Sequence, residues 1–237
     1  EALLVYAQAG QPVLLTPGIL MGITAPVTVA GAMAQAFAEL IGCVVLTQLA
    51  RAGTPVVIGL GGFGSDLRDA GCGFGRPEQA LSTIVGAQLS RRLELPYRGS
   101  PGATGAFRTD ARAGWESMMT AFAAWNSGVH VCLQAAGILD HINAMSYEKF
   151  IMDVEVWEYI KRISIEVRVD KERLALETIA ALPDSYMMAE HTVRHFRTEL
   201  HTPTLAPAIS YEAWLDAGSP EVSMSAREQL AKMETDG

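Results

Sequence analysis

One pattern recurs along the chain and limits its fold more than any other feature: a short apolar run, a glycine-rich loop and a long helical stretch. The runs are Pro12–Thr16, Thr54–Leu60, Leu95–Ser100 and Val129–Ala135. They begin roughly 40 residues apart, the size of a βα unit with a long loop. The first, second and fourth runs are apolar without strict alternation, as is typical of parallel strands buried on both faces.

Helices are expected between these runs. The three stretches are Val27–Arg51, Pro77–Leu93, whose proline suits a first helical turn, and Asp110–Asn126, which opens with a capping residue. After Ser146 the strand-like runs stop, and the pattern predicts helices from Ser146, then at Asp170–Leu182, Ala189–Leu200, Tyr211–Ala217 and Ser225–Thr235. We therefore expect parallel βα units over 1–145 and a helical extension packing on them over 146–237.

Alternating strands and helices leave two architectures, the (β/α)₈ TIM barrel and the open doubly wound sheet. No G-x-G-x-x-G motif opens a helix directly after a strand, which favours the barrel. Four strands make only half of a barrel, which usually needs about 250 residues. We expect the C-terminal half of a TIM barrel, with further strands before Glu1 or from another chain. A half-barrel exposes strand edges, so we also expect a homo-oligomer.

Composition narrows the class of protein. A net charge of −8 and a pI near 5.1 argue against nucleic-acid binding, which depends on clustered cations. The apolar stretch Ala25–Ala50 contains Glu39, and a charge near the middle of a membrane span costs roughly 2.5–3.5 kcal/mol. We interpret it as a core helix buried on most sides. Three dispersed cysteines without a CxxC pair, and no signal peptide, indicate the cytoplasm.

Four segments carry a resemblance to a known family. They read GITAPVTVAGAMAQAFAELIGCVVLTQLARAGTPVVIG, FGRPEQALSTIVGAQLSRRLELPYRG, QAAGILD…SYEKFIMDVE and EHTVRHFRTEL. Together, from about Gly22 to Pro203, the chain resembles the C-terminal half of the trimethylamine methyltransferase family. The resemblance implies a (β/α)₈ barrel that moves a methyl group from a methylated amine to the Co(I) of a corrinoid, which a separate small protein carries.

The branch of that family is indicated by what the sequence lacks. The trimethylamine enzymes hold pyrrolysine in the barrel, whereas this sequence shows only the twenty ordinary residues. The closer analogue is the branch without pyrrolysine, whose known members use quaternary amines such as glycine betaine. Two alternatives stay open: a non-catalytic or truncated barrel fragment that binds a ligand or a partner, and a barrel enzyme of another chemistry.

Polar residues just after each strand are the substrate-binding candidates, because barrel active sites lie at the carboxyl ends of strands. Tyr97 is placed either to face an ammonium group through a cation–π contact or to be a wall aromatic. Arg98 is placed either to hold a substrate carboxylate or to form a salt bridge with Asp110 or Glu116. The sequence does not identify the catalytic residue.

Three further candidates follow other strands. Gln134 lies in an apolar run and is expected to point into the barrel, where a buried amide needs a partner. Asp66 is placed to attract a cation or to pair with a neighbouring arginine, and Thr24 follows the first strand. The loop Arg98–Asp110 reads as a mobile lid, a corrinoid-docking loop or a plain connection.

The segment AEHTVRHFRTEL sets His191 and His195 four residues apart on an expected helix. A metal site needs a third ligand, and the HExxH spacing is absent, so we expect no metal here. The preferred interpretation is a basic helix face that pairs with carboxylates of the barrel's helices or meets the corrinoid protein.

Overall fold

The computed structural model describes residues 1–61, 64–68, 70–206 and 208–235. Its central element is a four-stranded sheet in which every neighbouring pair is parallel. In spatial order, the strands are β1 (Val13–Leu15), β2 (Val56–Gly59), β5 (Tyr97–Gly99) and β6 (Val131–Cys132). Each lies inside one of the four predicted runs. The α/β class with a parallel sheet is therefore confirmed.

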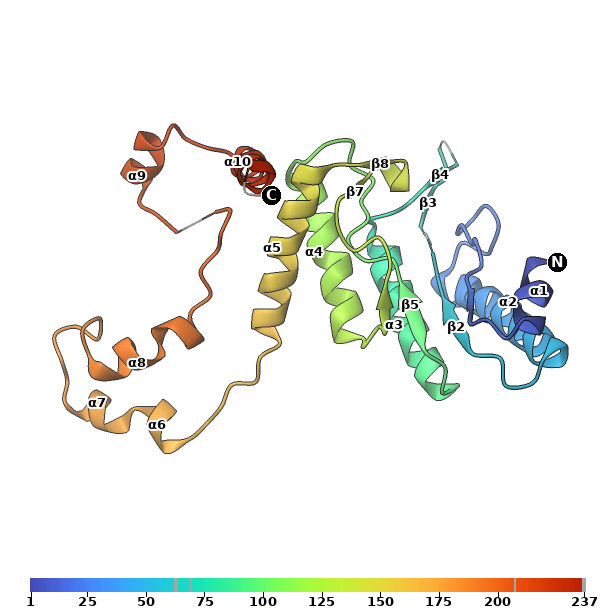
Figure 1. Cartoon of the computed structure of the whole chain (residues 1–237), viewed down its shortest axis with the longest axis horizontal. Coiled ribbons are helices and arrows are strands. Elements are labelled where there is room, and N and C mark those ends of the chain that lie inside the picture. Colours follow the sequence, from blue (N-terminus) through green and yellow to red (C-terminus); the bar gives the residue numbers. More distant parts are fainter. Residues whose placement is uncertain (62–63, 69, 207, 236–237) are drawn as a thin grey trace.

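A row of helices accompanies the sheet (Figure 1). Its members are α2 (Val29–Ala50), α3 (Pro77–Arg92), α4 (Ala111–Asn126) and α5 (Tyr147–Ile163), and each packs against the next. Their starts follow from the sequence: the side chains of Asp110 and Ser146 accept hydrogen bonds from the backbone of α4 and α5, and Pro77 opens α3.

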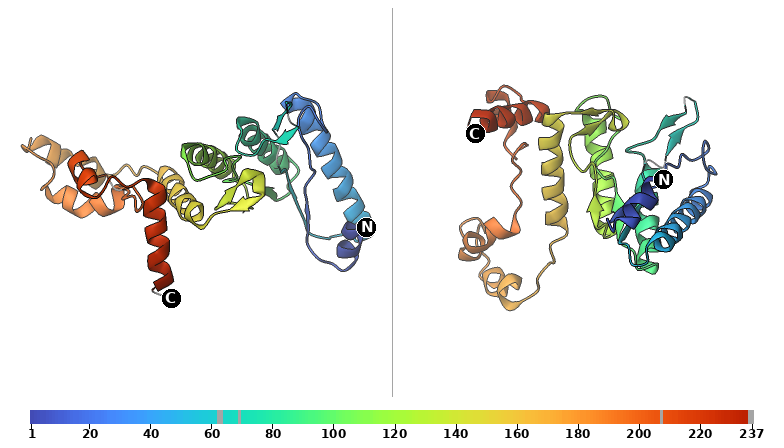
Figure 2. Two further views of the ribbon diagram at one scale, coloured as in Figure 1. Left: turned by 90° about the horizontal axis from the view of Figure 1, so that it is seen from above. Right: turned by 45° about the vertical axis from the view of Figure 1, so that its right-hand side comes forward.

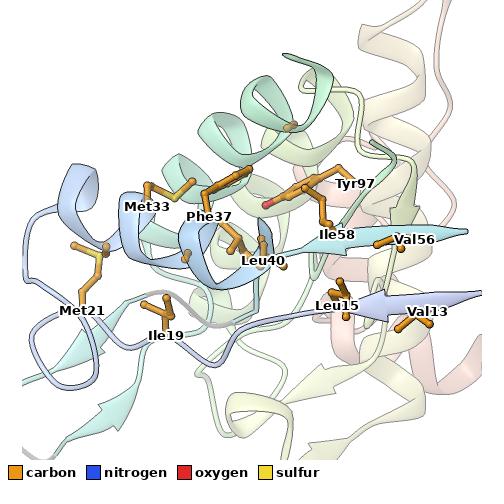
Figure 3. Close-up of a cluster of buried hydrophobic side chains, with 14 residues drawn as sticks. Val13, Leu15, Ile19, Met21, Met33, Phe37, Leu40, Val56, Ile58 and Tyr97 are labelled. Atoms are coloured by element: carbon orange, nitrogen blue, oxygen red, sulfur yellow. The ribbon is translucent and has the colours of Figure 1, made fainter. Parts of the chain in front are cut away.

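The hydrophobic core lies between the sheet and the first two helices of this row, α2 and α3 (Figure 3). Leu15, Ile58 and Tyr97 come from three adjacent strands and meet Met33 and Phe37 of α2. Successive residues of a strand point to opposite faces. Hence the strand residues directly before and after Leu15, Ile58 and Tyr97 face away from the helices.

Helix α2 is buried on one side only, so the expectation that it is buried on most sides was wrong. Its inner face is buried, whereas its outer face exposes a stripe of aliphatic side chains: Ile41, Val45, Leu46 and Leu49. α1 (Ala2–Gln8) packs against it but leaves that stripe open. Within the described residues, α2 alone has the length and apolar composition of a membrane span, which is weak evidence because core helices have both.

Two short hairpins lie beyond the carboxyl ends of the strands, and the sequence predicted neither. They are β3 (Ser65–Asp66) with β4 (Gly71–Cys72), and β7 (Ile138–Leu139) with β8 (Ala144–Met145). A 3₁₀ segment, η1 (Asp140–Ile142), connects the second pair. Two-residue strands are too short to show alternation, so no periodic signal announces them.

The chain after α5 extends away from the rest of the molecule and then returns to α5 (Figures 1 and 2). It forms α6 (Lys171–Leu174), α7 (Leu176–Ala180), α8 (Glu190–Glu199), α9 (Tyr211–Asp216) and α10 (Val222–Thr235). We call residues 164–204 the arm; none of them is buried. The single helix predicted over Asp170–Leu182 was wrong, because Ala175 takes a left-handed backbone conformation, φ 50°, and divides it.

The extension, 146–237, was expected to pack on the units before it, and its first helix does so, because α5 packs on α4. Helix α10 packs on α5. Just before it, Leu205 is 4% exposed, and Thr204 bonds Glu155 of α5 through its backbone N–H, 3.0 Å, and its hydroxyl, 2.6 Å. The arm also returns to α5 before this point, because Arg162 donates to the Glu199 carbonyl and lies 3.7 Å from the Glu199 carboxylate.

Candidate functional site

Arg98 lies across the face of the sheet that is turned away from the helices. Its neighbour Tyr97 belongs to the helix-side core, so alternation puts Arg98 on the other face. Arg98 Nε donates to Thr16 Oγ1 at 3.1 Å, and Nη1 donates to Ser100 Oγ at 2.6 Å. The side chain thus spans from β5 over β2 to the end of β1, and the residue is only 8% exposed.

No carboxylate among the described residues pairs with Arg98. The salt bridges considered from the sequence do not form: Asp110 pairs with Arg108 at 3.5 Å, and Glu116 pairs with Arg112 at 2.8 Å. Burial lowers the pKa of Arg98, but a guanidinium stays protonated at neutral pH. A largely buried cation without a counter-charge is costly. The position therefore fits an anionic group of a ligand.

Tyr97 faces the opposite way. It is 1% exposed within the core, and its hydroxyl lies against Gly86 of α3, where a Cβ would overlap it. Burial raises the pKa of Tyr97. This is the wall-aromatic arrangement, and it leaves no ring face for an ammonium group at the carboxyl ends of the strands.

Gln134 follows β6 in a left-handed backbone conformation, φ 51°. Such a conformation costs a non-glycine residue roughly 1–2 kcal/mol and persists where neighbours hold it. The next residue is held: the carbonyl of Ala135 accepts from Trp157 Nε1 at 2.9 Å. Gln134 itself is exposed, so the expectation of a buried amide was wrong for this chain by itself. With no protein partner in the described chain, its amide is open to a ligand.

Asp66 and Thr24 both have protein partners. Asp66 pairs with Arg68 at 2.6 Å and with Arg76 at 3.0 Å, and these donors hold the pKa of its carboxyl well below the usual range. Thr24 is exposed, and its hydroxyl accepts from Leu20 N at 2.8 Å, which closes a turn. The structure therefore shows structural roles for both in this part of the chain.

The backbone after β5 is a buried loop rather than a lid. Residues 100–106 are all buried, and three helices hold them. Gln79 of α3 donates to the Ser100 carbonyl at 2.8 Å, and Glu116 of α4 accepts from Gly105 N at 3.0 Å. Lys149 of α5 donates to the Gly102 carbonyl at 3.1 Å. The glycines suggested a flexible loop in the sequence, but they permit close packing here.

The two histidines of α8 serve a structural contact. Their rings lie 4.6 Å apart, and His195 Nε2 lies 3.2 Å from a carboxylate oxygen of Glu172 in α6. Arg194 reaches the same carboxylate at 3.0 Å. Across the described ranges, no three side chains of metal-ligating type converge. The carboxylate that these side chains contact belongs to α6 of the arm and not to a helix of the expected barrel.

Comparison with known proteins gives one family match and several relatives. The sequence model of the trimethylamine methyltransferase (MTTB) family matches residues 1–236. Glycine betaine methyltransferase of Desulfitobacterium hafniense (strain Y51) is 37% identical over 215 residues, 90% of this chain and 45% of that protein. Proline betaine:corrinoid methyltransferase of Eubacterium limosum is 31% identical over 195 residues, 81% of this chain and 40% of that protein.

A third relative matches a larger share of this chain. Trimethylamine methyltransferase MttB of Desulfitobacterium hafniense (strain DSM 10664 / DCB-2) is 28% identical over 231 residues, 97% of this chain and 46% of that protein. The chain thus spans a little under half the length of the curated relatives it matches.

Proposed function

The chain belongs to the trimethylamine methyltransferase family, and from this premise we propose that it is part of an amine:corrinoid methyltransferase. The whole protein would transfer a methyl group from a methylated amine to the Co(I) of a corrinoid carried by a separate protein. Relatives named as corrinoid methyltransferases that act on proline betaine and L-carnitine support this proposal.

The sheet is proposed to be half of a (β/α)₈ barrel. Strands in sequential order and a single row of consecutively packed helices support this, because a doubly wound sheet carries helices on both faces. The relatives' greater length leaves room for the remaining strands. We keep the division into 1–145 and 146–237, with α5 as the joining element.

The unpaired Arg98 carries the proposal for the substrate class. Glycine betaine has a carboxylate that a guanidinium binds with two parallel hydrogen bonds, whereas trimethylamine has none. Arg98 is 8% exposed, lacks a carboxylate partner in the described chain and is held by Thr16 and Ser100. We therefore propose a quaternary amine with a carboxylate, such as glycine betaine, as the substrate.

In this mechanism the described residues bind and orient. Arg98 fixes the carboxylate, and the Gln134 amide is available to restrain the rest of the substrate. The corrinoid, when bound, supplies a Co(I) nucleophile. The bond between nitrogen and the methyl carbon breaks, its electrons stay on nitrogen, and a neutral tertiary amine leaves without needing a proton. Orientation of this kind contributes roughly 7–11 kcal/mol in favourable geometries.

The test uses the full-length protein with a corrinoid protein reduced to Co(I). With glycine betaine we expect catalytic loss of the Co(I) absorbance. With trimethylamine we expect the absorbance to stay unchanged. Proline betaine and carnitine, which also carry carboxylates, test the breadth of the site. If no methylated amine lowers the Co(I) absorbance, the methyltransferase proposal is refuted. Turnover of trimethylamine alone would refute the proposed role of Arg98 in binding a substrate carboxylate.

We further propose that the arm contacts a second copy of the chain. The surface of the structure is 14469 Å², about 4,000 Å² more than a compact monomer of 25.4 kDa exposes. The other half of the proposed barrel would cover part of this excess, and interfaces of obligate oligomers bury roughly 2,000–5,000 Å². Large apolar side chains of the arm contribute to the excess; Leu182, Met187 and Met188 are all at least 76% exposed.

A further inference from the structure

We propose that Lys149 and Asp153 are positioning residues for the substrate-binding groups Arg98 and Gln134. They act through the backbone that follows β5 and β6 and touch neither side chain. This inference rests on the proposed function, because it concerns the same site. Neither residue was among the candidates taken from the sequence.

The pair is buried at the contact of α4 and α5. Lys149 is 1% exposed and Asp153 is 3% exposed, and Nζ lies 2.5 Å from Asp153 Oδ2. Nζ also donates to Ser117 Oγ at 2.9 Å and to the Gly102 carbonyl at 3.1 Å. An ammonium group has three N–H donors, and here three acceptors receive them.

The same pair holds a second segment. Asp153 Oδ2 accepts from Gly137 N at 2.8 Å, on the chain between β6 and β7. The two held segments also touch each other: a Cβ at Gly102 would lie 2.5 Å from the Ala135 carbonyl oxygen. One ion pair therefore joins the buried loop after β5 to the turn after β6 at their point of contact.

Both substrate-binding groups are attached to these segments. Ser100, in the same buried loop as Gly102, accepts the hydrogen bond from Arg98 Nη1 at 2.6 Å. Gln134 directly precedes Ala135, whose carbonyl lies against Gly102, and belongs to the same turn as Gly137. Displacement of Gly102 or Gly137 would move the groups that aim Arg98 and Gln134.

Stability alone is a weak explanation for such a pair. Replacing a buried ion pair by apolar residues of similar volume is often neutral for stability. Burial lowers the pKa of Lys149 and raises the pKa of Asp153, so each charge depends on the other. What an apolar pair does not reproduce is the directed hydrogen bonds to Gly102 and Gly137.

The test compares two double variants of the full-length protein. Lys149→Met with Asp153→Leu removes the buried pair without leaving a lone charge. Lys161→Met with Glu158→Leu removes an exposed pair of the same helix, 2.6 Å apart, and is the matched control. Calorimetry without corrinoid measures the Kd for glycine betaine, steady-state kinetics measures KM and kcat, and circular dichroism measures folding.

We expect the buried-pair variant to fold, with Kd and KM raised at least tenfold and kcat at saturation within threefold of wild type. The control stays within twofold. A folded buried-pair variant with wild-type Kd and KM would overturn the proposal. If that variant does not fold, Ser117→Ala keeps the pair but removes one acceptor of Nζ and the hydrogen bond that the Ser117 hydroxyl donates to the Gly102 carbonyl at 3.0 Å. We expect a threefold rise in Kd, and an unchanged Kd would overturn the proposal.

Hydrogen exchange separates this proposal from the proposed function. If the wild type binds no betaine, the function fails, yet the positioning of the backbone is still measurable. We expect the amides within residues 100–106 and that of Gly137 to exchange at least tenfold faster in the buried-pair variant and at an unchanged rate in the control. Unchanged exchange in both would overturn the positioning role whatever the substrate.

Discussion

Arg98 lies flat over Gly59 of the neighbouring strand. A Cβ at position 59 would overlap Arg98 Cγ and lie 2.6 Å from the Arg98 carbonyl oxygen. The two residues are paired in the β2–β5 register, so the absence of a side chain on one strand provides the space for the long side chain of the other.

We expect Gly59→Ala to weaken betaine binding because the added methyl group displaces Arg98 from Thr16 and Ser100. The backbone at position 59 does not have a positive φ, so the effect is one of space rather than of strain. Calorimetry should show a Kd raised about tenfold. Gly53→Ala is unsuitable as a control because its φ is +81°, whereas Gly114→Ala meets nothing within 4 Å and serves as one.

We expect Arg98→Met to remove the binding of carboxylate-bearing amines. Hydrogen bonds to charged groups contribute about 1.5–3 kcal/mol, so the KM for glycine betaine should rise about 10- to 150-fold. Arg98→Lys should recover only part of this, because an ammonium group cannot form the two-pronged contact. An equal KM for glycine betaine in Arg98→Met and wild type would contradict the proposal that Arg98 binds the substrate carboxylate.

We expect Leu205→Ala to loosen the arm. Leu205 is buried and lines a hollow of about 180 Å³ together with Tyr159 and Val222, and truncating such a side chain costs roughly 2–5 kcal/mol. Limited proteolysis should cut the arm faster while α3 and α4 stay intact. Leu200→Ala, at a position 67% exposed, is the control and should cut at the wild-type rate.

We expect the β3–β4 hairpin to loosen in acid. Contact with Arg68 and Arg76 lowers the pKa of Asp66 from 3.8, so its stabilising effect is fully present above pH 3.8 and is lost as the pH falls from there through the lowered pKa. Amide exchange in the hairpin, followed from about pH 5 to about pH 2 and corrected for intrinsic rates, should accelerate. In Asp66→Asn, the hairpin amides should exchange faster than in wild type at the upper end of this pH range, and their exchange should change less as the pH falls.

We expect arm substitutions to change the oligomeric state. Leu182→Ser with Met188→Ser replaces two side chains that are 81% and 82% exposed, so folding of one copy should be unaffected. Light scattering of the full-length protein should show a smaller assembly than wild type. An unchanged mass would contradict the proposed contact between copies.

The strands and the helix starts were predictable because their signals are local. An apolar run such as Thr54–Leu60 defines a buried strand, and Asp110 and Ser146 mark helix starts that the structure keeps. The break at Ala175 was not predictable, because alanine favours helix and nothing in the neighbouring sequence disrupts it.

The face of the sheet on which each site residue lies was harder to predict than the strand that carries it. The run Leu95–Ser100 contains a strand of three residues, and a shift of one residue exchanges its two faces. The sequence therefore placed both Tyr97 and Arg98 at the site, whereas the structure puts Tyr97 in the core. The role of Lys149 depends on loops that are distant in sequence, so spacing within its own helix did not reveal it.

The burial of Lys149 also makes it a chemical reporter. The other three lysines are exposed: Lys161, Lys171 and Lys232. An amine-reactive reagent should acylate these three in the folded protein and reach Lys149 only when α5 separates from α4. The rate at which this last lysine is acylated would then measure the opening of that helix pair without any substitution in the chain.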